Sequence, residues 1–213
     1  MPFYCIWVNF CRRGISPSLG VDCVKDLVEI RWHGRGGQGV VTAAKLLAET
    51  ALGQNKYFQA FPEYGPERMG APIQAFTRIS PTAIGIHCNI TNPNIVIVLD
   101  STLLGTVDVA DGVPSDGIFI INGDKPAQEL RKKMNTDKGK IFSVDATQIA
   151  LETLGKPIPN TPMLGALLKA TGLMKIEDLL EHMRSSFGKK FSREIIEGNV
   201  KAIERAYNEV KSE

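Results

Sequence analysis

The sequence predicts an α/β fold with three α/β/α layers, in which a Rossmann-like sheet carries helices on both faces. Two observations lead to this prediction. Residues 28–51 follow the order strand, glycine turn and alanine-rich helix without a break. The run Ile95–Leu99 is continuously apolar and mostly β-branched, as is typical of a strand buried on both faces of a parallel sheet. Strand signals and helical signals alternate along the rest of the chain.

The glycine turn has the spacing G-x-G-x-x-G. Glycine tolerates the positive φ angles of a tight turn and lets a phosphate approach the backbone. The free N–H groups at the start of the next helix, Val40 to about Ala51, then face the anion. The alternative is a turn whose glycines serve only close packing of helix and strand. The candidate cofactor-binding residues here are Gly34, Gly36, Gly37, Gln38 and Gly39.

A dinucleotide site would need a second anchor. An acidic residue is expected about 20 positions after the glycines, at the end of the second strand, to bind the ribose hydroxyls. Gln59 occupies that position, within the predicted strand Tyr57–Phe61, and the nearest acid is Glu63 beyond Pro62. An NAD(P)-binding dehydrogenase therefore remains an alternative that lacks this anchor.

The segment Phe61–Pro72 is a stiff loop that carries reactive side chains. It has three prolines and two glycines in twelve residues, so regular structure is disfavoured. Stiff loops with charged groups often recognise a ligand or a partner. Arg68, its only cation, is a cofactor-binding candidate, because a guanidinium can bind a phosphate or a carboxylate in bidentate fashion. The alternative is a solvated surface turn. The other candidates in this loop are Glu63, Tyr64 and Glu67.

Further strands are predicted at Pro72–Ser80, Ile118–Ile121 and Lys140–Val144, with a helix at Pro126–Met134 before the last of them. Asp100 follows the buried strand Ile95–Leu99. An acid at the carboxyl end of a central strand lies where open α/β sheets bind ligands, which makes Asp100 a site candidate. Its alternative role is to cap a short helix at residues 101–104.

Two helices are predicted near the C-terminus. Thr161 is expected to cap the first, with Pro162 at the first helical position and the end at Gly172. Contact with a partner subunit is the competing role of this segment. The second is expected from Phe191 to about Val210. Its apolar stripe is expected to pack on the sheet or on a neighbouring subunit, and it comprises Phe191, Ile195, Ile196, Val200, Ile203, Tyr207 and Val210.

Composition indicates a soluble protein of the cytoplasm. The chain has 213 residues, 43% of them hydrophobic, which suits one well-buried domain. Its formal charge of only +2 does not indicate a nucleic-acid-binding surface. No apolar run approaches the length of about 20 residues that a membrane span needs. The four cysteines form no C-x-x-C pair and the three histidines have no partners at metal-ligand spacing. We therefore expect neither a metal nor a catalytic residue on this chain.

Residues 1–27 differ in character from the rest of the chain. Arg12 and Arg13 come after the apolar part, which is the wrong order for a signal peptide. We interpret residues 1–27 as a leader of uncertain role, or as the product of a start site assigned too early. Residues 28–213 are expected to form a single domain.

Four separated segments together resemble the gamma subunit of 2-oxoacid:ferredoxin oxidoreductases. The resemblance runs from Val28 to the C-terminus. The amino-acid sequence of Arg68–Pro72 is more similar to that of the pyruvate and branched-chain enzymes, such as pyruvate synthase, than to that of the 2-oxoglutarate type. The four segments are Gly34–Gly39, Pro62–Pro72, Phe76–Ser80 and Asn160–Ala166.

The resemblance implies a subunit with no complete active site of its own. It implies that thiamine diphosphate, magnesium and 4Fe-4S clusters are held by partner subunits of alpha, beta and delta type, and that ferredoxin accepts the electrons. Coenzyme A would be a substrate that meets this subunit at the interface of the complex. The resemblance thus implies a contribution to coenzyme A binding and to assembly in the oxidative decarboxylation of pyruvate to acetyl-CoA, with a non-binding scaffold as a further alternative.

Overall fold

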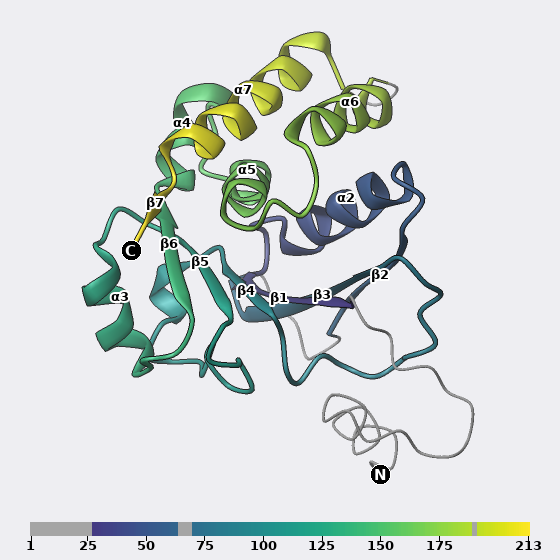
Figure 1. Cartoon of the computed structure of the whole chain (residues 1–213). Coiled ribbons are helices and arrows are strands. Elements are labelled where there is room, and N and C mark those ends of the chain that lie inside the picture. Colours follow the sequence, from purple (N-terminus) through teal and green to yellow (C-terminus); the bar gives the residue numbers. More distant parts are fainter. Residues whose placement is uncertain (1–26, 64–69, 189–190) are drawn as a thin grey trace.

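The computed structural model describes residues 27–63, 70–188 and 191–213, which form a seven-stranded sheet in the order β2-β3-β1-β4-β5-β6-β7 (Figure 1). Residues 1–26 of the predicted leader and the candidates Tyr64, Glu67 and Arg68 lie outside the described residues. The strands are β1 (Val28–Arg35), β2 (Tyr57–Pro62), β3 (Pro72–Ser80), β4 (Ile95–Val98), β5 (Ile118–Asn122), β6 (Lys140–Val144) and β7 (Lys211–Ser212).

The sheet is mixed. β1, β4, β5 and β6 run parallel, whereas β3 lies antiparallel between β1 and β2. The short β7 closes the other edge, antiparallel to β6. The helix after β1 therefore crosses over β3 to reach β2, which lies two places from β1. In a dinucleotide fold the second strand neighbours the first, so this order differs from the arrangement that the NAD(P) alternative requires.

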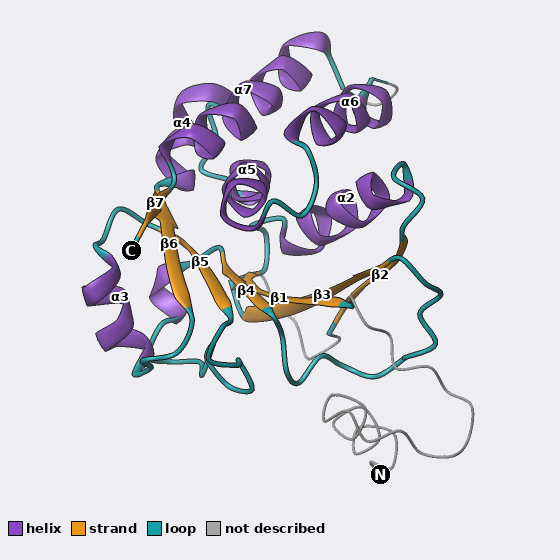
Figure 2. Cartoon of the chain, in the orientation of Figure 1, coloured by secondary structure: helices purple, strands orange, loops and turns teal. Residues whose placement is uncertain are grey.

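Helices cover both faces of the sheet, which confirms the predicted three-layer fold (Figure 2). One face carries most of the helices, and the opposite face carries α3 and the short 3₁₀ helix η1. The helices are α2 (Val40–Leu52), η1 (Ser101–Leu103), α3 (Ala127–Met134), α4 (Ala146–Leu154), α5 (Asn160–Thr171), α6 (Ile176–Phe187) and α7 (Arg193–Glu209).

Successive residues of β4 point into two different apolar cores, one on each face of the sheet. Ile95 and Ile97 pack into the larger core, beneath α2 and α5. Val96 and Val98 pack into the smaller core, with Leu130 of α3. Because successive strand residues point to opposite faces, a strand buried on both sides must be apolar at every position, as this one is.

The face of β1 opposite the helices is polar but buried. Glu29, Arg31 and His33 alternate with core residues and are 2–5% exposed. Loops rather than a helix cover them: Arg31 donates to the carbonyl oxygens of Val109 and Asp111, at 3.1 and 2.6 Å. Arg31 is therefore satisfied by neighbouring loops, as a buried polar group requires.

The two C-terminal helices differ in detail from the prediction. Helix α5 begins at Asn160, so Thr161 is not its cap; Thr161 lies in the first turn and its hydroxyl donates to the side-chain oxygen of Asn199, at 2.9 Å. Gly172 ends the helix in the left-handed conformation, as expected.

Helix α7 spans Arg193–Glu209, and two members of the predicted stripe, Phe191 and Ile195, are 47% and 46% exposed. The stripe is narrower because α7 lies on α5 and α4, outside the layer that touches the sheet (Figure 1). A helix that packs on other helices needs only a narrow apolar seam. In the part of the chain that the structure describes, no helix is both long and apolar enough to span a bilayer.

Candidate functional site

Four segments that are distant in the sequence meet at the carboxyl ends of β1 and β4. They are the glycine turn 36–39, the start of β3 at residues 70–72, Asp100 with η1, and the first turn of α5. The connection after β1 runs to the helix-rich face, whereas the connection after β4 packs into the core of the opposite face. Such a reversal is the position at which open α/β sheets form their ligand crevice.

The glycines of the turn have different structural roles. Gly37 is exposed with φ +97°, and a Cβ added there would meet no atom within 4 Å. Gly39 has φ +75° and lies against the side chain of Asn160. Gly34 is a packing residue, because a Cβ there would lie 2.5 Å from Val40 Cγ2. The open part of the turn is thus centred on Gly37.

Backbone hydrogen bonds tie the turn to the stiff loop that precedes β3. The N–H of Gly36 donates to the carbonyl of Ala71 at 3.0 Å, and the carbonyl of Gly36 accepts from the N–H of Gly70 at 3.2 Å. The described end of the loop therefore lies beside the glycine turn. Its residues Tyr64, Glu67 and Arg68 are outside the described ranges.

The side-chain amide of Gln38 forms two hydrogen bonds that stabilise the glycine turn. Its side-chain oxygen accepts from the N–H of Arg35 at 2.8 Å, and its side-chain nitrogen donates to the Asp100 carboxylate at 2.9 Å. Both ends of the amide are thus engaged inside the protein. We infer that Gln38 holds the conformation of the turn rather than reaching out of it.

Asp100 has the capping role that its position in the sequence allowed, while its role as a site residue stays a prediction. It caps η1, where one carboxylate oxygen accepts from the N–H of Thr102 at 2.9 Å. Its other oxygen accepts from Gln38 and from Arg35 Nε, at 2.9 and 3.1 Å. Partial burial opposes its ionisation, but the hydrogen bonds from Thr102 and Gln38 and the charge of Arg35 together lower the pKa of Asp100 below its ordinary value.

The sequence alone does not single out Arg35, because it occupies a variable position of the glycine pattern. Its Nε donates to Asp100, one terminal nitrogen donates to the Gly70 carbonyl at 3.1 Å, and the other donates to the Thr102 hydroxyl at 2.9 Å. Each terminal nitrogen carries two N–H bonds, so each retains one donor beyond these contacts. The side chain is 32% exposed, which leaves this fixed guanidinium accessible beside the turn.

The start of α5 reaches the same place. Asn160 contacts Gly39, and its side-chain oxygen accepts from the N–H of Thr161 at 2.8 Å. The first turns of α2 and α5 therefore lie side by side. The start of α2 presents free N–H groups and a partial positive charge. In α5 the N–H of Thr161 is already bonded to Asn160 and Pro162 has no N–H. The described donors at this edge are therefore those of α2 and the Arg35 guanidinium.

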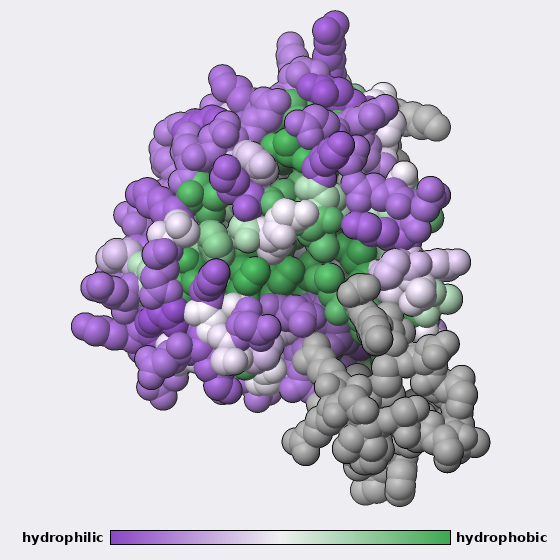
Figure 3. All heavy atoms as spheres, viewed as in Figure 1, coloured by the Kyte–Doolittle hydropathy of each residue, from purple (hydrophilic) through white to green (hydrophobic). Residues whose placement is uncertain are grey.

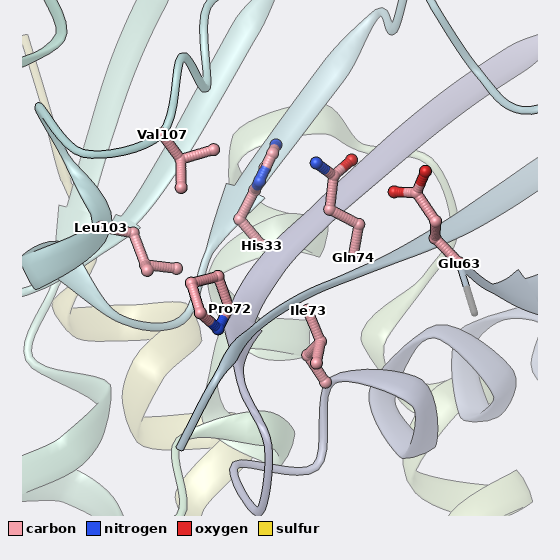
Figure 4. Close-up of a pocket in the computed structure, with 7 residues that line it drawn as sticks. All are labelled: His33, Glu63, Pro72, Ile73, Gln74, Leu103 and Val107. Carbon is pink, nitrogen blue, oxygen red and sulfur yellow. The ribbon is translucent and has the colours of Figure 1, made fainter. Parts of the chain in front are cut away.

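A small pocket lies next to this edge, on the face of the sheet opposite α2 and α5 (Figure 4). Its volume is about 150 Å³. The candidate Glu63 lies here, separated from the glycine turn. The pocket is lined by His33, Glu63, Pro72, Ile73, Gln74, Leu103 and Val107.

His33 in this pocket is a neutral imidazole. Its Nε2 accepts from Arg31 Nε at 3.1 Å. Burial, and then the positive charge of Arg31, lower the pKa of His33 to about 3. The proton of the neutral ring is therefore on Nδ1.

We expect acid to destabilise the protein through His33. A histidine with a depressed pKa in the folded state takes up a proton on unfolding, so stability is lost as pH falls from about 6.5 toward 3. The loss approaches about 1.4 kcal/mol per pH unit within that window. Urea titrations at pH 7, 6 and 5 would measure it. The His33→Gln variant should have a flatter profile, and identical slopes in both proteins would contradict this prediction.

The groups at this edge, backbone N–H donors and a guanidinium, are of the kinds that bind anions. Within the described ranges, no group of three or more His, Cys, Asp or Glu residues could hold a metal ion. Gln59, at the position of the missing ribose anchor, is engaged elsewhere: it donates to the Ile84 carbonyl at 3.3 Å and accepts from Arg78. The phosphate site at the glycine turn stays a prediction. The structure shows that Asp100 and Asn160 lie beside this turn.

Comparisons with known proteins agree with one another. The model of the family "Pyruvate ferredoxin/flavodoxin oxidoreductase" matches residues 29–209. The pyruvate synthase subunit PorC of Thermotoga maritima is 48% identical over 187 residues, which is 88% of this chain and 96% of the relative. The common subunit gamma of the pyruvate/ketoisovalerate oxidoreductases of Thermococcus kodakarensis is 50% identical over 182 residues, 85% of this chain and 96% of the relative.

Solved structures show the same fold. The crystal structure of the pyruvate oxidoreductase subunit PORC from Thermotoga maritima matches with a TM-score of 0.79 and 45% identity, over 88% of this chain and 99% of that one. The 2-oxoglutarate:ferredoxin oxidoreductase of Magnetococcus marinus, solved with 2-oxoglutarate, coenzyme A and succinyl-CoA, matches with a TM-score of 0.68 and 19% identity, over 86% of this chain and 31% of that one. At that identity the second match shows the fold alone.

Proposed function

Because the chain belongs to the pyruvate ferredoxin/flavodoxin oxidoreductase family, as a relative of its gamma subunits, we propose that its glycine turn binds the phosphates of coenzyme A. The reaction is the oxidative decarboxylation of a 2-oxoacid, most plainly pyruvate, to its acyl-CoA in the cytoplasm. This chain supplies part of the coenzyme A site and part of the assembly surface.

The observation that carries the proposal is the open turn at Gly37, which lies at the start of α2 and beside Arg35. Coenzyme A has a pyrophosphate and a 3′-phosphate, which need donors and positive charge. Free N–H groups at the start of α2 provide donors. Arg35 provides a guanidinium that Asp100, Thr102 and Gly70 already hold in place. A fixed guanidinium loses little entropy when it binds a phosphate.

The remaining chemistry is assigned to partners. Thiamine diphosphate and magnesium would activate the 2-oxoacid on alpha- and beta-type subunits, and 4Fe-4S clusters would pass electrons to ferredoxin from a delta-type subunit. The task of this chain's own residues is to bind and orient the acyl acceptor. The fold relative from Magnetococcus marinus was solved with coenzyme A bound, which is compatible with this division.

The surface supports a role in assembly. Figure 3 shows apolar residues gathered in a band across the viewed face, at the level of the sheet and α5, with hydrophilic residues over the outer helices. Large exposed apolar patches on a soluble protein commonly mark protein interfaces. We infer that neighbouring subunits cover this band in the complex.

The proposed phosphate contact predicts a charge-specific effect at Gly37. The Gly37→Asp variant should raise the KM for coenzyme A in the assembled complex by about tenfold or more, because a carboxylate about 4 Å from a phosphate costs about 1–4 kcal/mol. The KM for pyruvate should change little. Steady-state kinetics over series of both substrates would measure this.

Gly37→Asn is the matched control. Asparagine has the same shape and tolerates positive φ about as well as aspartate does, but it carries no charge. It should leave the KM for coenzyme A within about threefold of the wild type, since it adds no charge repulsion. If both variants behave alike, the glycines serve packing only and the proposal is wrong.

A further inference from the structure

The pocket next to the carboxyl-end edge of the sheet contains polar groups whose hydrogen-bonding capacity the fold uses only in part. His33 lies on β1, Gln74 on β3, and Glu63 directly follows β2. Register places them in one row, because His33 pairs with Gln74 and the N–H of Glu63 donates to the Gln74 carbonyl at 3.0 Å. Figure 4 shows the three side chains rising on the same side of the sheet.

These groups retain unused hydrogen-bonding capacity. His33 is 2% exposed, and its Nδ1–H has no partner among the described residues. Every fully enclosed polar side-chain atom of those residues has a partner, so this Nδ1–H retains some exposed surface, and His33 lines the pocket. The side-chain amide of Gln74 also makes no hydrogen bond within the described ranges. Glu63 accepts from Asn89 at 3.3 Å through one oxygen, which leaves the other oxygen available. Polar groups aimed together into one pocket point to a ligand.

The chemistry of the pocket selects a neutral, flat ligand. Its described lining includes one carboxylate and no lysine or arginine, and His33 is neutral, so an anion is disfavoured. Pro72, Leu103 and Val107 provide apolar walls. A volume of about 150 Å³ is smaller than the roughly 300–1,000 Å³ of a typical complete ligand site. It therefore suits one ring system of a larger ligand.

We propose that this pocket binds the adenine ring of the coenzyme A whose phosphates occupy the glycine turn, an inference that rests on the proposed function. The exocyclic amine of adenine would donate to Glu63. Ring nitrogens would accept from His33 Nδ1–H and from the amide of Gln74, and the ring faces would contact the apolar walls. Pro72 pairs with Arg35 in the sheet and Leu103 follows Thr102, so the pocket lies within reach of the phosphate contacts.

The arrangement selects adenine against hypoxanthine. Hypoxanthine has a carbonyl oxygen where adenine has the amine, and an oxygen facing the Glu63 carboxylate would be repelled and left without a donor. A polar site that loses one hydrogen bond discriminates by about tenfold or more. The assembled wild-type complex should therefore have a KM at least about tenfold lower for coenzyme A than for its hypoxanthine analogue.

The test compares both acyl acceptors in complexes that carry Gln74→Leu or Gln148→Leu. Gln148 lies on α4, where it bonds Glu152, so it controls for the substitution itself. Gln74→Leu should raise the KM for coenzyme A by about tenfold and reduce the discrimination between the two acceptors, whereas Gln148→Leu should change neither. Calorimetric titration of the full chain with adenosine 3′,5′-bisphosphate should show the same loss of affinity in Gln74→Leu.

The outcomes separate this inference from the proposal beneath it. If Gly37→Asp raises the KM for coenzyme A but Gln74→Leu does not, the pocket does not bind adenine and the phosphate site stands. If wild type accepts both acceptors equally, the base is not recognised and the inference is overturned. If neither variant alters the use of coenzyme A, the proposed function itself is wrong.

Discussion

The Arg78→Met variant is expected to lose about 3–5 kcal/mol of unfolding free energy. Arg78 is 1% exposed, and its Nε donates to the Glu29 carboxylate at 3.0 Å across β3 and β1. The same guanidinium donates to Gln59 at 3.3 Å. Methionine keeps much of the side-chain volume but removes the cation. The carboxylate of Glu29, which is 4% exposed, then stays buried without the positive charge of Arg78. Urea denaturation at pH 7 would measure the loss.

The double variant Glu29→Gln, Arg78→Met is the control for charge. Removing the carboxylate as well should recover part of the lost stability, because the cost of a buried ion without its partner exceeds the net contribution of the pair. A double variant whose loss equals the sum of the two single losses would show that the pair is not coupled. The prediction would then be wrong.

Gly165→Ala is expected to cost about 3 kcal/mol of unfolding free energy, the upper part of the usual range for overpacking. Gly165 lies in the middle of α5, where α7 crosses closely. A Cβ at this position would lie 2.1 Å from the backbone oxygen of Ile203 and 3.1 Å from the backbone nitrogen of Tyr207. A side chain could rotate to another rotamer to avoid this Cβ, but backbone atoms cannot. Helix α7 must therefore move away from α5. Thermal unfolding would show a lowered Tm.

Gly53→Ala is the matched substitution without a clash. Gly53 has φ −61°, and the nearest atom that an added Cβ would meet is the Thr50 oxygen, at 3.4 Å. Alanine there should leave stability unchanged or raise it by about 0.4–1 kcal/mol, because it restricts the unfolded chain. Equal losses at both positions would contradict the explanation by helix crossing.

Local patterns were sufficient to predict most of the strands and the position of the glycine turn. Pro72–Ser80 and Lys140–Val144 have the predicted bounds, and β1 runs directly into the turn and α2. These segments have a strong signal because each is bounded by glycine, proline or a change of period. The proximity of Asp100 to the turn also followed from a local rule, since the carboxyl ends of parallel strands meet at one edge.

The strand order and the position of Arg35 depend on tertiary contacts, which local sequence patterns do not predict. No local signal shows that β3 would lie between β1 and β2, because strand order depends on which surfaces pack together. Arg35 has no distinctive spacing; its role depends on Asp100 and Thr102, which lie 65 and 67 positions further along the chain. The row of His33, Gln74 and Glu63 likewise exists only through the pairing of three strands.

The antiparallel β3 has a consequence for how the chain folds. Residues 28–80 can form a three-stranded unit with α2 from contacts that are fairly close in sequence, whereas β4 can pair with β1 only after a longer loop closes. Until then the free edge of β1 and the apolar run Ile95–Val98 are both exposed to other chains. We expect the time during which β4 is unpaired to limit the folding yield at high protein concentration, because exposed strand edges pair between chains.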